Sequence, residues 1–220
     1  MVVAKPSGVV VHRSEMGREA EPLLQRVRDA LGCWVHPVHR LDRGTSGCLL
    51  FALRREVLPG LVEALRAGEK RYLALVRGHV RSLEPVTVDR PMKSSRGILQ
   101  DARTHLAPVA GSAEPRASLV LARPETGRFH QIRRHLRDLS HPVLGDTTHG
   151  DTRVNRAWRE EFGLHRLALH CASLDLPLPE GPLRVVCPIP DDLGHVLRRM
   201  PWWEEARRAL PELLGAEAAA

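Results

Sequence analysis

The stretch "VHRLDRGTSG", residues 38–47, sets a single acidic residue, Asp42, among His39, Arg40 and Arg43 and follows it with four small residues. Nearby positive charge favours the charged form of a carboxylate, which suits a nucleophile or a base better than an acid. The "GTSG" segment combines flexible glycines with hydroxyl groups that can bond local backbone, so it predicts a sharp turn directly before a strand. Such a turn would place Asp42 at the rim of a sheet. A surface aspartate with local ion pairs is the alternative interpretation of the same residues.

The size and composition of the chain predict one folded unit. With 220 residues, 43% of them hydrophobic, it can bury one good core, so we expect a single domain over residues 1–220, with two small domains as the alternative. No apolar run approaches the roughly 18 residues that a membrane-spanning helix needs. The first residues, "MVVAKPSG", lack the charged start and long apolar centre of a secretory signal. A cytoplasmic location is therefore expected.

Charge and cysteine usage narrow the class of function. The chain has 33 Lys and Arg against 26 Asp and Glu, a net charge of +7, which favours a polyanionic partner such as nucleic acid but also fits a solvated basic surface. The histidines are scattered, and none belongs to an HExxH pair. The cysteines show no Cys-x-x-Cys spacing, so we expect buried, reduced thiols and neither a zinc site nor a redox motif. These are Cys33, Cys48, Cys171 and Cys187.

The pattern of apolar residues predicts an α+β protein with a largely antiparallel or mixed sheet, because neighbouring strands lack regular helical crossovers. Strands are predicted at residues 9–11, 48–53, 72–76, 117–122, 167–174 and 183–187. Helices are predicted at 19–31, 57–67, 129–139, 155–162 and 201–214. Residues 94–114, rich in Arg, Ser, Gly and Pro, predict an extended arm or insert, with an ordinary surface loop as the alternative. Residues 215–220, "GAEAAA", predict a frayed tail.

A second cluster, "ETGRFHQIRRHL" at residues 125–136, begins a predicted helix with basic side chains. Ile132 and Leu136 would share an apolar face, while His130, Arg133 and Arg134 would line adjacent faces. Cations near the start of a helix oppose its dipole, so helix stability alone does not account for them. An anionic partner would account for them, and a solvated basic helix face is the alternative.

Six blocks of the sequence occur in a recognisable order. They are "KPSG" (residues 5–8), "HRLDRGTSG" (39–47), "KRY" (70–72), "GRFHQIRRHL" (127–136), "HPVLGD" (141–146) and "RLALH" (166–170). By these blocks the chain resembles the RluA family of pseudouridine synthases from near its first residue to about Pro188. The resemblance implies an enzyme that detaches uracil from its ribose in RNA and rejoins it through carbon. It also implies a mixed, mainly antiparallel sheet, a basic active-site cleft, and no cofactor or metal.

The resemblance also assigns roles to residues. Asp42 matches the family's catalytic carboxylate, as nucleophile or base. Arg133 matches its salt-bridge partner, with a phosphate contact as the alternative. Tyr72 matches the active-site tyrosine, which stacks on the uracil and assists proton removal, with a core aromatic as the alternative. Arg40 matches the residue that enters the RNA stack when the uridine flips out. Further substrate contacts are expected at His39, Arg43, Thr45, Arg128, His130, Gln131 and Arg134.

Other features bear on the substrate. The doubled arginine at 133–134, "HGDTRVNR" (149–156) and "FGLHRLALH" (162–170) resemble the TruC-type branch of that family, which modifies transfer RNA at uridine 65 of the T stem. An S4-type RNA-binding domain does not fit in front of Lys5, so the catalytic domain itself is expected to select the RNA. A helix start with cationic and amide donors would contact the RNA backbone, through Arg153, Asn155, Arg156 and Arg159.

Three alternatives stay open at this point. The first is a 23S ribosomal RNA pseudouridine synthase of the same family. The second is an RNA-binding relative that has lost the chemistry, although it would have no evident reason to keep Asp42, Tyr72 and Arg133 together. The third, a glycoside hydrolase, would need a second carboxylate near the first, and neither cluster offers one.

Overall fold

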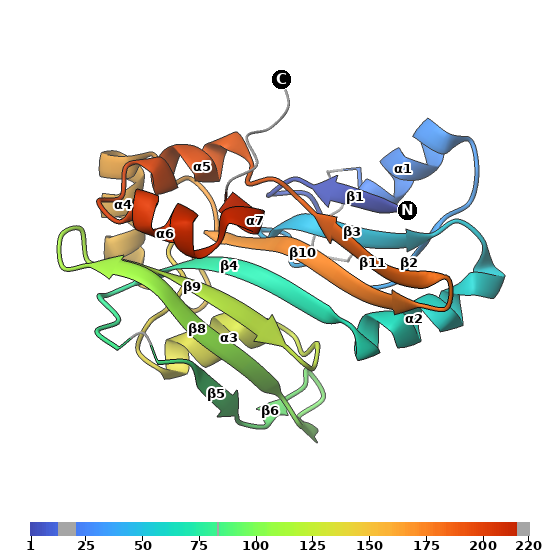
Figure 1. Ribbon diagram of the computed structural model, residues 1–220, viewed down its shortest axis with the longest axis horizontal. Coiled ribbons are helices and arrows are strands. Elements are labelled where there is room, and N and C mark those ends of the chain that lie inside the picture. Colours follow the sequence, from blue (N-terminus) through green and yellow to red (C-terminus); the bar gives the residue numbers. More distant parts are fainter. Residues whose placement is uncertain (13–20, 83, 215–220) are drawn as a thin grey trace.

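The computed structural model describes residues 1–12, 21–82 and 84–214 of the chain. Within these residues one long, twisted sheet runs through the molecule in the order β1-β3-β10-β4-β9-β8-β5, and helices pack on both sides of it (Figure 1). Strands β3 and β10 run parallel, and the other neighbours in this sheet run antiparallel. The expected α+β fold with a mixed, mainly antiparallel sheet is confirmed.

The elements have the following bounds. The main path of the sheet contains β1 (Val2–Lys5), β3 (Ser46–Ala52), β10 (Leu169–Leu178), β4 (Glu69–Arg77), β9 (Ala117–Pro124), β8 (Arg103–Ser112) and β5 (Val86–Asp89). Two further strands extend it, β2 (His36–Pro37) beside β3 and β11 (Gly181–Val186) beside β10, while β6 (Met92–Lys93) and β7 (Leu99–Gln100) form a separate hairpin. The helices are α1 (Leu23–Leu31), α2 (Leu58–Ala67), α3 (Gln131–Asp138), α4 (Thr152–Phe162), α5 (Asp191–Arg198), α6 (Trp203–Ala209) and α7 (Pro211–Leu214).

Strand β3 anchors the stretch at residues 38–47 in the centre of the sheet. All seven of its residues are buried, as expected for a strand covered on both faces. Gly47 follows Ser46 in the parallel pairing with β10 and lies opposite Cys171, at a φ of +114°. A Cβ at this position would lie 2.1 Å from the carbonyl oxygen of Cys171, so only glycine fits. The close approach of the two backbones fixes where the loop before β3 leaves the sheet.

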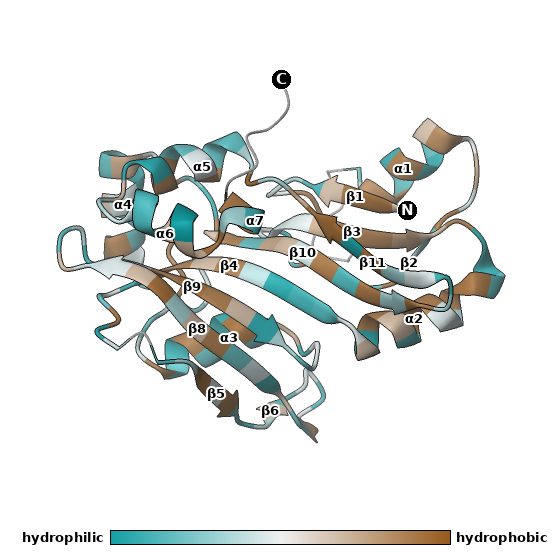
Figure 2. Cartoon of the chain, in the orientation of Figure 1, coloured by the Kyte–Doolittle hydropathy of each residue, from teal (hydrophilic) through white to brown (hydrophobic). Residues whose placement is uncertain are grey.

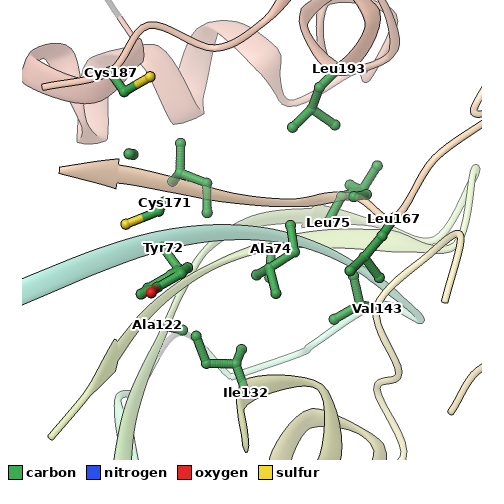
Figure 3. Packing of buried hydrophobic residues seen from close by; sticks show 14 of the residues in the cluster. Tyr72, Ala74, Leu75, Ala122, Ile132, Val143, Leu167, Cys171, Cys187 and Leu193 are labelled. Atoms are coloured by element: carbon green, nitrogen blue, oxygen red, sulfur yellow. The ribbon is translucent and has the colours of Figure 1, made fainter. Parts of the chain in front are cut away.

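The hydrophobic core surrounds the middle of the sheet. Figure 2 shows hydrophobic colour along β3, whereas the start of β4 is hydrophilic. Tyr72, at the boundary between the two halves of β4, pairs across the sheet with Cys171 on one side and Ala122 on the other. Figure 3 shows these three side chains in the cluster, together with Ile132 from α3. Helix α3 is thus packed against the sheet next to the point where β4 changes from polar to apolar.

Most of the predicted elements are present, with shifted ends. The predicted strands at 48–53, 72–76, 117–122, 167–174 and 183–187 correspond to β3, β4, β9, β10 and β11. Helix α1 ends at Leu31, as predicted, and Gly32 follows as its C-cap with a left-handed φ of +64°. Residues 19 and 20 of the predicted helix at 19–31, and the tail at 215–220, lie outside the described residues. The helix predicted at 201–214 is two helices, α6 and α7, with a break at Leu210.

Two predictions are wrong. Residues 9–11 are not a strand; the edge strand is β1, and the chain turns away after it because the buried Lys5 ammonium binds the carbonyl oxygens of Pro6 and Val9 at 2.9 and 2.6 Å. Residues 94–114 are not an extended arm, because residues 103–112 form β8, paired with β9 on one side and β5 on the other. Small residues and an alternation of buried positions, rather than large apolar groups, hold β8 in the sheet.

One negative observation concerns membranes. Among the residues that the structure describes, no helix has both the length and the apolar character that crossing a bilayer requires.

Candidate active site

A cavity of ≈ 600 Å³ opens where the loop before β3 meets β4 and the start of α3. Its cationic lining comprises Arg40, Arg66, Lys70, Arg128 and Arg133, and its acidic lining comprises Asp42 and Glu125. It also contains His39, Thr45, Tyr72, His130 and Gln131. The two sequence clusters that were singled out above, residues 38–47 and 125–136, therefore form two walls of the same cavity. Positive charge predominates in it, as an anionic ligand requires.

Asp42 and Arg133 form an ion pair although 91 residues separate them. The Nη1 atom of Arg133 lies 3.0 Å from Oδ2 of Asp42, and the side chains are 7% and 21% exposed, respectively. A charge-assisted hydrogen bond of this kind holds a carboxylate ionised and oriented. Within the described residues the other oxygen, Oδ1, has no hydrogen-bond partner. The pair thus directs one carboxylate oxygen towards the cavity while it holds the other.

Asp146, in the loop after α3, fixes Arg133 from the opposite side. Its two oxygens accept hydrogen bonds from Nε and Nη2 of Arg133 at 2.7 and 2.8 Å. Its Oδ1 also accepts the backbone amides of Thr148 and His149, both at 2.9 Å. Burial acts to raise the pKa of Asp146, but the Arg133 hydrogen bonds and these amides outweigh it and lower the pKa below the usual value. Asp146 therefore holds Arg133 by two hydrogen bonds, and the Nη1 atom of Arg133 remains for Asp42.

The "KPSG" block holds the loop that carries Asp42. The Lys5 ammonium binds the carbonyl oxygen of Arg43 at 3.1 Å, and the hydroxyl of Ser7 binds that of Gly44 at 2.8 Å. The amide of Thr45 closes a turn on the carbonyl oxygen of Asp42 at 3.1 Å. Burial, together with the charge of Arg166, lowers the pKa of Lys5 to about 8, and the nearby Asp42 partly opposes this. These bonds fix the backbone from Asp42 to Thr45, as the small residues in this turn predict.

Tyr72 lies at the base of the cavity. The residue is 8% exposed and belongs to the hydrophobic cluster, and it also lines the cavity. Tyr72 is therefore both a core aromatic and a cavity residue. Burial, reinforced by the neighbouring Cys171 and by the negative charge of Asp42, raises the pKa of the Tyr72 phenol well above its usual value. Tyr72 is therefore a protonated phenol at neutral pH, able to donate a hydrogen bond into the cavity.

Two histidines of the cavity are neutral at physiological pH. His39 accepts the backbone amide of Leu50 at its Nε2 atom, at 3.1 Å, and burial with the charge of Lys70 lowers its pKa to about 4. This bond ties the loop to β3, so His39 supports the backbone of the site in addition to lining the cavity. Burial also lowers the pKa of His130 to about 4, against the pull of Asp42. His130 precedes α3 with a left-handed φ of 54°.

The structure distinguishes among the other expected contact residues. Gln131 is buried and bonded at both ends, accepting from Thr126 at 2.7 Å and donating to the backbone of Arg103 at 2.9 Å, so it ties the turn before α3 to β8. Thr45 lines the cavity, and its hydroxyl oxygen is buried and, within the described residues, has no hydrogen-bond partner. Arg40 is exposed and lines the cavity, whereas Arg128, which also lines it, is half-buried and donates from Nε to the carbonyl oxygen of Asp101 at 2.8 Å.

Three predicted contact residues lie elsewhere. Arg43 does not line the cavity; its Nε atom binds the carbonyl oxygen of Gly8 at 3.0 Å. Arg134 points from α3 to the β6–β7 hairpin, where its Nη1 atom lies 3.4 Å from the carbonyl oxygen of Lys93. Asn155, expected to contact RNA, is buried and bridges Gly145 and Asp146 through two hydrogen bonds of 2.9 Å. Its amide is used to shape the loop that carries Asp146, and is not free for a partner.

Sequence reasoning missed several residues of the site. Asp146 and Lys5 belong to quoted blocks, "HPVLGD" and "KPSG", but only the fold shows that their side chains reach Arg133 and the loop of Asp42. Lys70 lines the cavity beside the expected Tyr72, and burial lowers its pKa. His149 contacts His130 across 19 residues of sequence. The signal that could have found Asp146 is an acid placed directly after a glycine turn and the buried apolar pair Val143 and Leu144.

The comparisons with known proteins agree with this site. The profile of the RNA pseudouridylate synthase family matches residues 1–138, which include Asp42, Tyr72 and Arg133. The chain belongs to this family of isomerases, and the family resemblance of its sequence blocks is confirmed.

Individual relatives cover most of the chain. It is 37% identical to the tRNA pseudouridine synthase C of Vibrio parahaemolyticus over 93% of each chain, and 41% identical to that of Yersinia pestis over 81% of this chain and 78% of the relative. Among solved structures it is similar to human RNA pseudouridylate synthase domain containing 4, with a TM-score of 0.71 and 26% identity over 90% of this chain and 88% of that one. Human RNA pseudouridylate synthase domain containing 1 gives a TM-score of 0.68 and 29% identity over 86% and 79%.

Proposed function

We propose that this chain is a tRNA pseudouridine synthase of the cytoplasm that isomerises uridine 65 of the T stem. The observation that supports the chemical part is the partly buried Asp42–Arg133 pair, which leaves one oxygen of Asp42 without a hydrogen-bond partner among the described residues, beside a basic cavity. The choice of transfer RNA is supported by the relatives above, which are named tRNA pseudouridine synthase C. A cavity that encloses a single base requires the uridine to leave its stack, and Arg40 at the mouth is the cation placed to occupy the gap.

The reaction rearranges one molecule, so its atoms balance without a co-substrate. The bond between C1′ and N1 breaks, the base turns over, and a bond forms between C1′ and C5; the proton of C5 leaves and N1 gains one. Asp42 Oδ1 faces the ribose in this proposal, either as a nucleophile at C1′ or as a base. The unpartnered hydroxyl of Thr45 and the Tyr72 phenol are the polar groups available to the base. Arg133 holds Asp42 in position through the hydrogen bond to its Oδ2 atom.

Tyr72→Phe separates the hydroxyl of this residue from its ring. The ring stays in the core, so we expect the melting temperature to change by no more than a few degrees, while the single-turnover rate falls by roughly a hundredfold or more if the phenol takes part in proton transfer. Rapid-quench measurement of pseudouridine in an unmodified tRNA transcript gives the rate. An unchanged rate would restrict Tyr72 to packing and stacking.

The substrate is tested with transcripts. Purified protein is incubated with unmodified tRNA and with fragments of 23S ribosomal RNA, and pseudouridines are mapped by chemical labelling and primer extension. We expect a single modified position, in the T stem of the tRNA. Modification of a ribosomal hairpin alone would support the ribosomal alternative, and binding of both RNAs without any pseudouridine would support a relative that has lost the chemistry.

The helix α4 supplies a finer test of tRNA recognition. Arg153, Arg156 and Arg159 are exposed on it, next to the loop of Asp146. If they contact the RNA backbone, their replacement by Gln should raise the KM for tRNA and reduce its salt dependence while leaving kcat nearly unchanged.

A further inference from the structure

Two histidines face each other beside the carboxylate of the site. The Nδ1 atom of His130 lies 3.0 Å from Nε2 of His149, with the rings nearly perpendicular, at 86°. The opposite nitrogen of His130, Nε2, lies 3.8 Å from Oδ2 of Asp42. His149 is itself held by its backbone amide on Asp146, the residue that fixes Arg133. The two histidines thus lie between both carboxylates of the site, His130 by its ring at Asp42 and His149 by its backbone amide at Asp146.

The hydrogen bond between the rings admits only two arrangements of protons when both rings are neutral. In the first, His130 donates from Nδ1, and the lone pair on its Nε2 then faces the negatively charged oxygen of Asp42. In the second, His149 donates from Nε2, and His130 carries its proton on Nε2, where the N–H dipole points at that oxygen. The first arrangement is repulsive and the second attractive, so the carboxylate selects the second.

We propose that His149 is a positioning residue, which holds His130 in the tautomer whose Nε2–H faces Oδ2 of Asp42. His130 and Arg133 then direct their donors to the same oxygen, so that Oδ1 alone stays available for the reaction. The statement that Oδ1 takes part in the reaction rests on the proposed function. The tautomer of His130 does not rest on it. At 3.8 Å the His130 contact orients the carboxylate by its dipole and is not a hydrogen bond.

The surroundings of His130 support a neutral, fixed ring. The charged groups that face it are Asp42, Arg133 and Asp146, and its other neighbours are His149 and the ring of Phe129, which stacks on it with centroids 3.7 Å apart. Burial lowers the pKa of both histidines, so neither is charged at pH 7. His130 also keeps a left-handed backbone, a strained conformation for this residue type that persists only where contacts impose it.

Substitutions of His149 test whether the side chain at this position must donate a hydrogen bond to His130. Glutamine places an amide N–H near the position of the imidazole Nε2, so His149→Gln should keep most of the single-turnover rate. His149→Leu removes the donor and should lower the rate roughly five- to tenfold. His149→Glu offers only acceptors, which draws the proton of His130 to Nδ1, and should lower the rate further than Leu does. His195→Leu, on the exposed side of α5, is the matched control. Equal rates for the Gln and Leu variants would contradict the proposal.

The tautomer is read directly by two-bond ¹⁵N–¹H correlation spectra of the imidazoles, with the His130 signals identified from a His130→Gln sample. We expect the Nε2–H form of His130 in the unaltered protein at pH 7 and its loss in His149→Glu. A proton on Nδ1, or a charged ring, in the unaltered protein overturns the assignment. This measurement needs no RNA, so a protein that forms no pseudouridine refutes the proposed function while the tautomer is still decided.

Discussion

Asp42→Asn is expected to lower the rate of pseudouridine formation by at least roughly a thousandfold, as the loss of a nucleophile or base does in other enzymes. Asparagine has the shape of aspartate, and its carbonyl oxygen can still accept the hydrogen bond from Arg133, so the fold and the cavity should persist. The amide lacks the negative charge that either role at the ribose requires. The rate is measured in single turnover with an unmodified tRNA transcript.

The same variant should bind that transcript within a few-fold of the unaltered protein, because contacts to phosphates supply most of the affinity for RNA. The exposed arginines at the mouth and on α4 are unchanged by it. Asp192→Asn is the control: it also removes an aspartate from an arginine, Arg166 at 3.0 Å, but outside the cavity, and should leave the rate unchanged. A fully active Asn variant would remove Asp42 from the chemistry and with it the proposed mechanism.

Sequence reasoning identified the parts of the site that lie in short, ordered blocks. Asp42, Tyr72 and Arg133 each stand in a block whose order along the chain matches one family, and the structure brings all three to one cavity. The core strands β3, β4 and β10 were also predictable, since continuous apolar runs indicate strands that are buried on both faces. These signals are local, and a single sequence displays them.

The remaining parts depend on contacts between distant segments. Strand β8 escaped prediction because its buried residues are only Thr104, Leu106 and Ala110, too few to form an apolar run, and its place in the sheet follows from pairing with β9 and β5. Gln131 and Asn155 each stand in a basic stretch of sequence and were therefore expected to contact RNA. The sequence does not show whether such a polar side chain faces solvent or bonds to the backbone. Only the fold shows that their amides are already used.

Asp146 is the clearest case of such a contact, and its removal is expected to have a large effect on stability. Its carboxylate and the Arg133 guanidinium are both buried and joined by two hydrogen bonds. Replacing one member of a buried ion pair leaves the other without its charge partner, which destabilises a protein by about 3–5 kcal/mol. Asp146→Asn keeps the shape and one acceptor, so we expect a loss of about 3 kcal/mol in the free energy of unfolding, measured in urea at pH 7.

The pH dependence of the stability lost in Asp146→Asn tests whether the charge of Asp146 causes that loss. Since the pKa of Asp146 is lower in the folded protein than its usual value of 3.8, the charged group stabilises the fold at every pH above that value, and this contribution disappears as the pH falls through the folded pKa. The difference between the unaltered protein and Asp146→Asn should therefore be constant from pH 7 to about pH 5 and shrink below pH 3.8.

Asp138→Asn is the matched control for Asp146. Asp138 also bonds to arginines, Arg137 at the end of α3 and Arg90, but those arginines lie in solvent, where an ion pair contributes no more than about 1 kcal/mol. If both variants lose the same stability, the buried contact of Asp146 with Arg133 is no stronger than a surface ion pair. Arg133 would then be free to leave Asp42, and the orientation of the reactive carboxylate would have to come from the backbone turn at Thr45 alone.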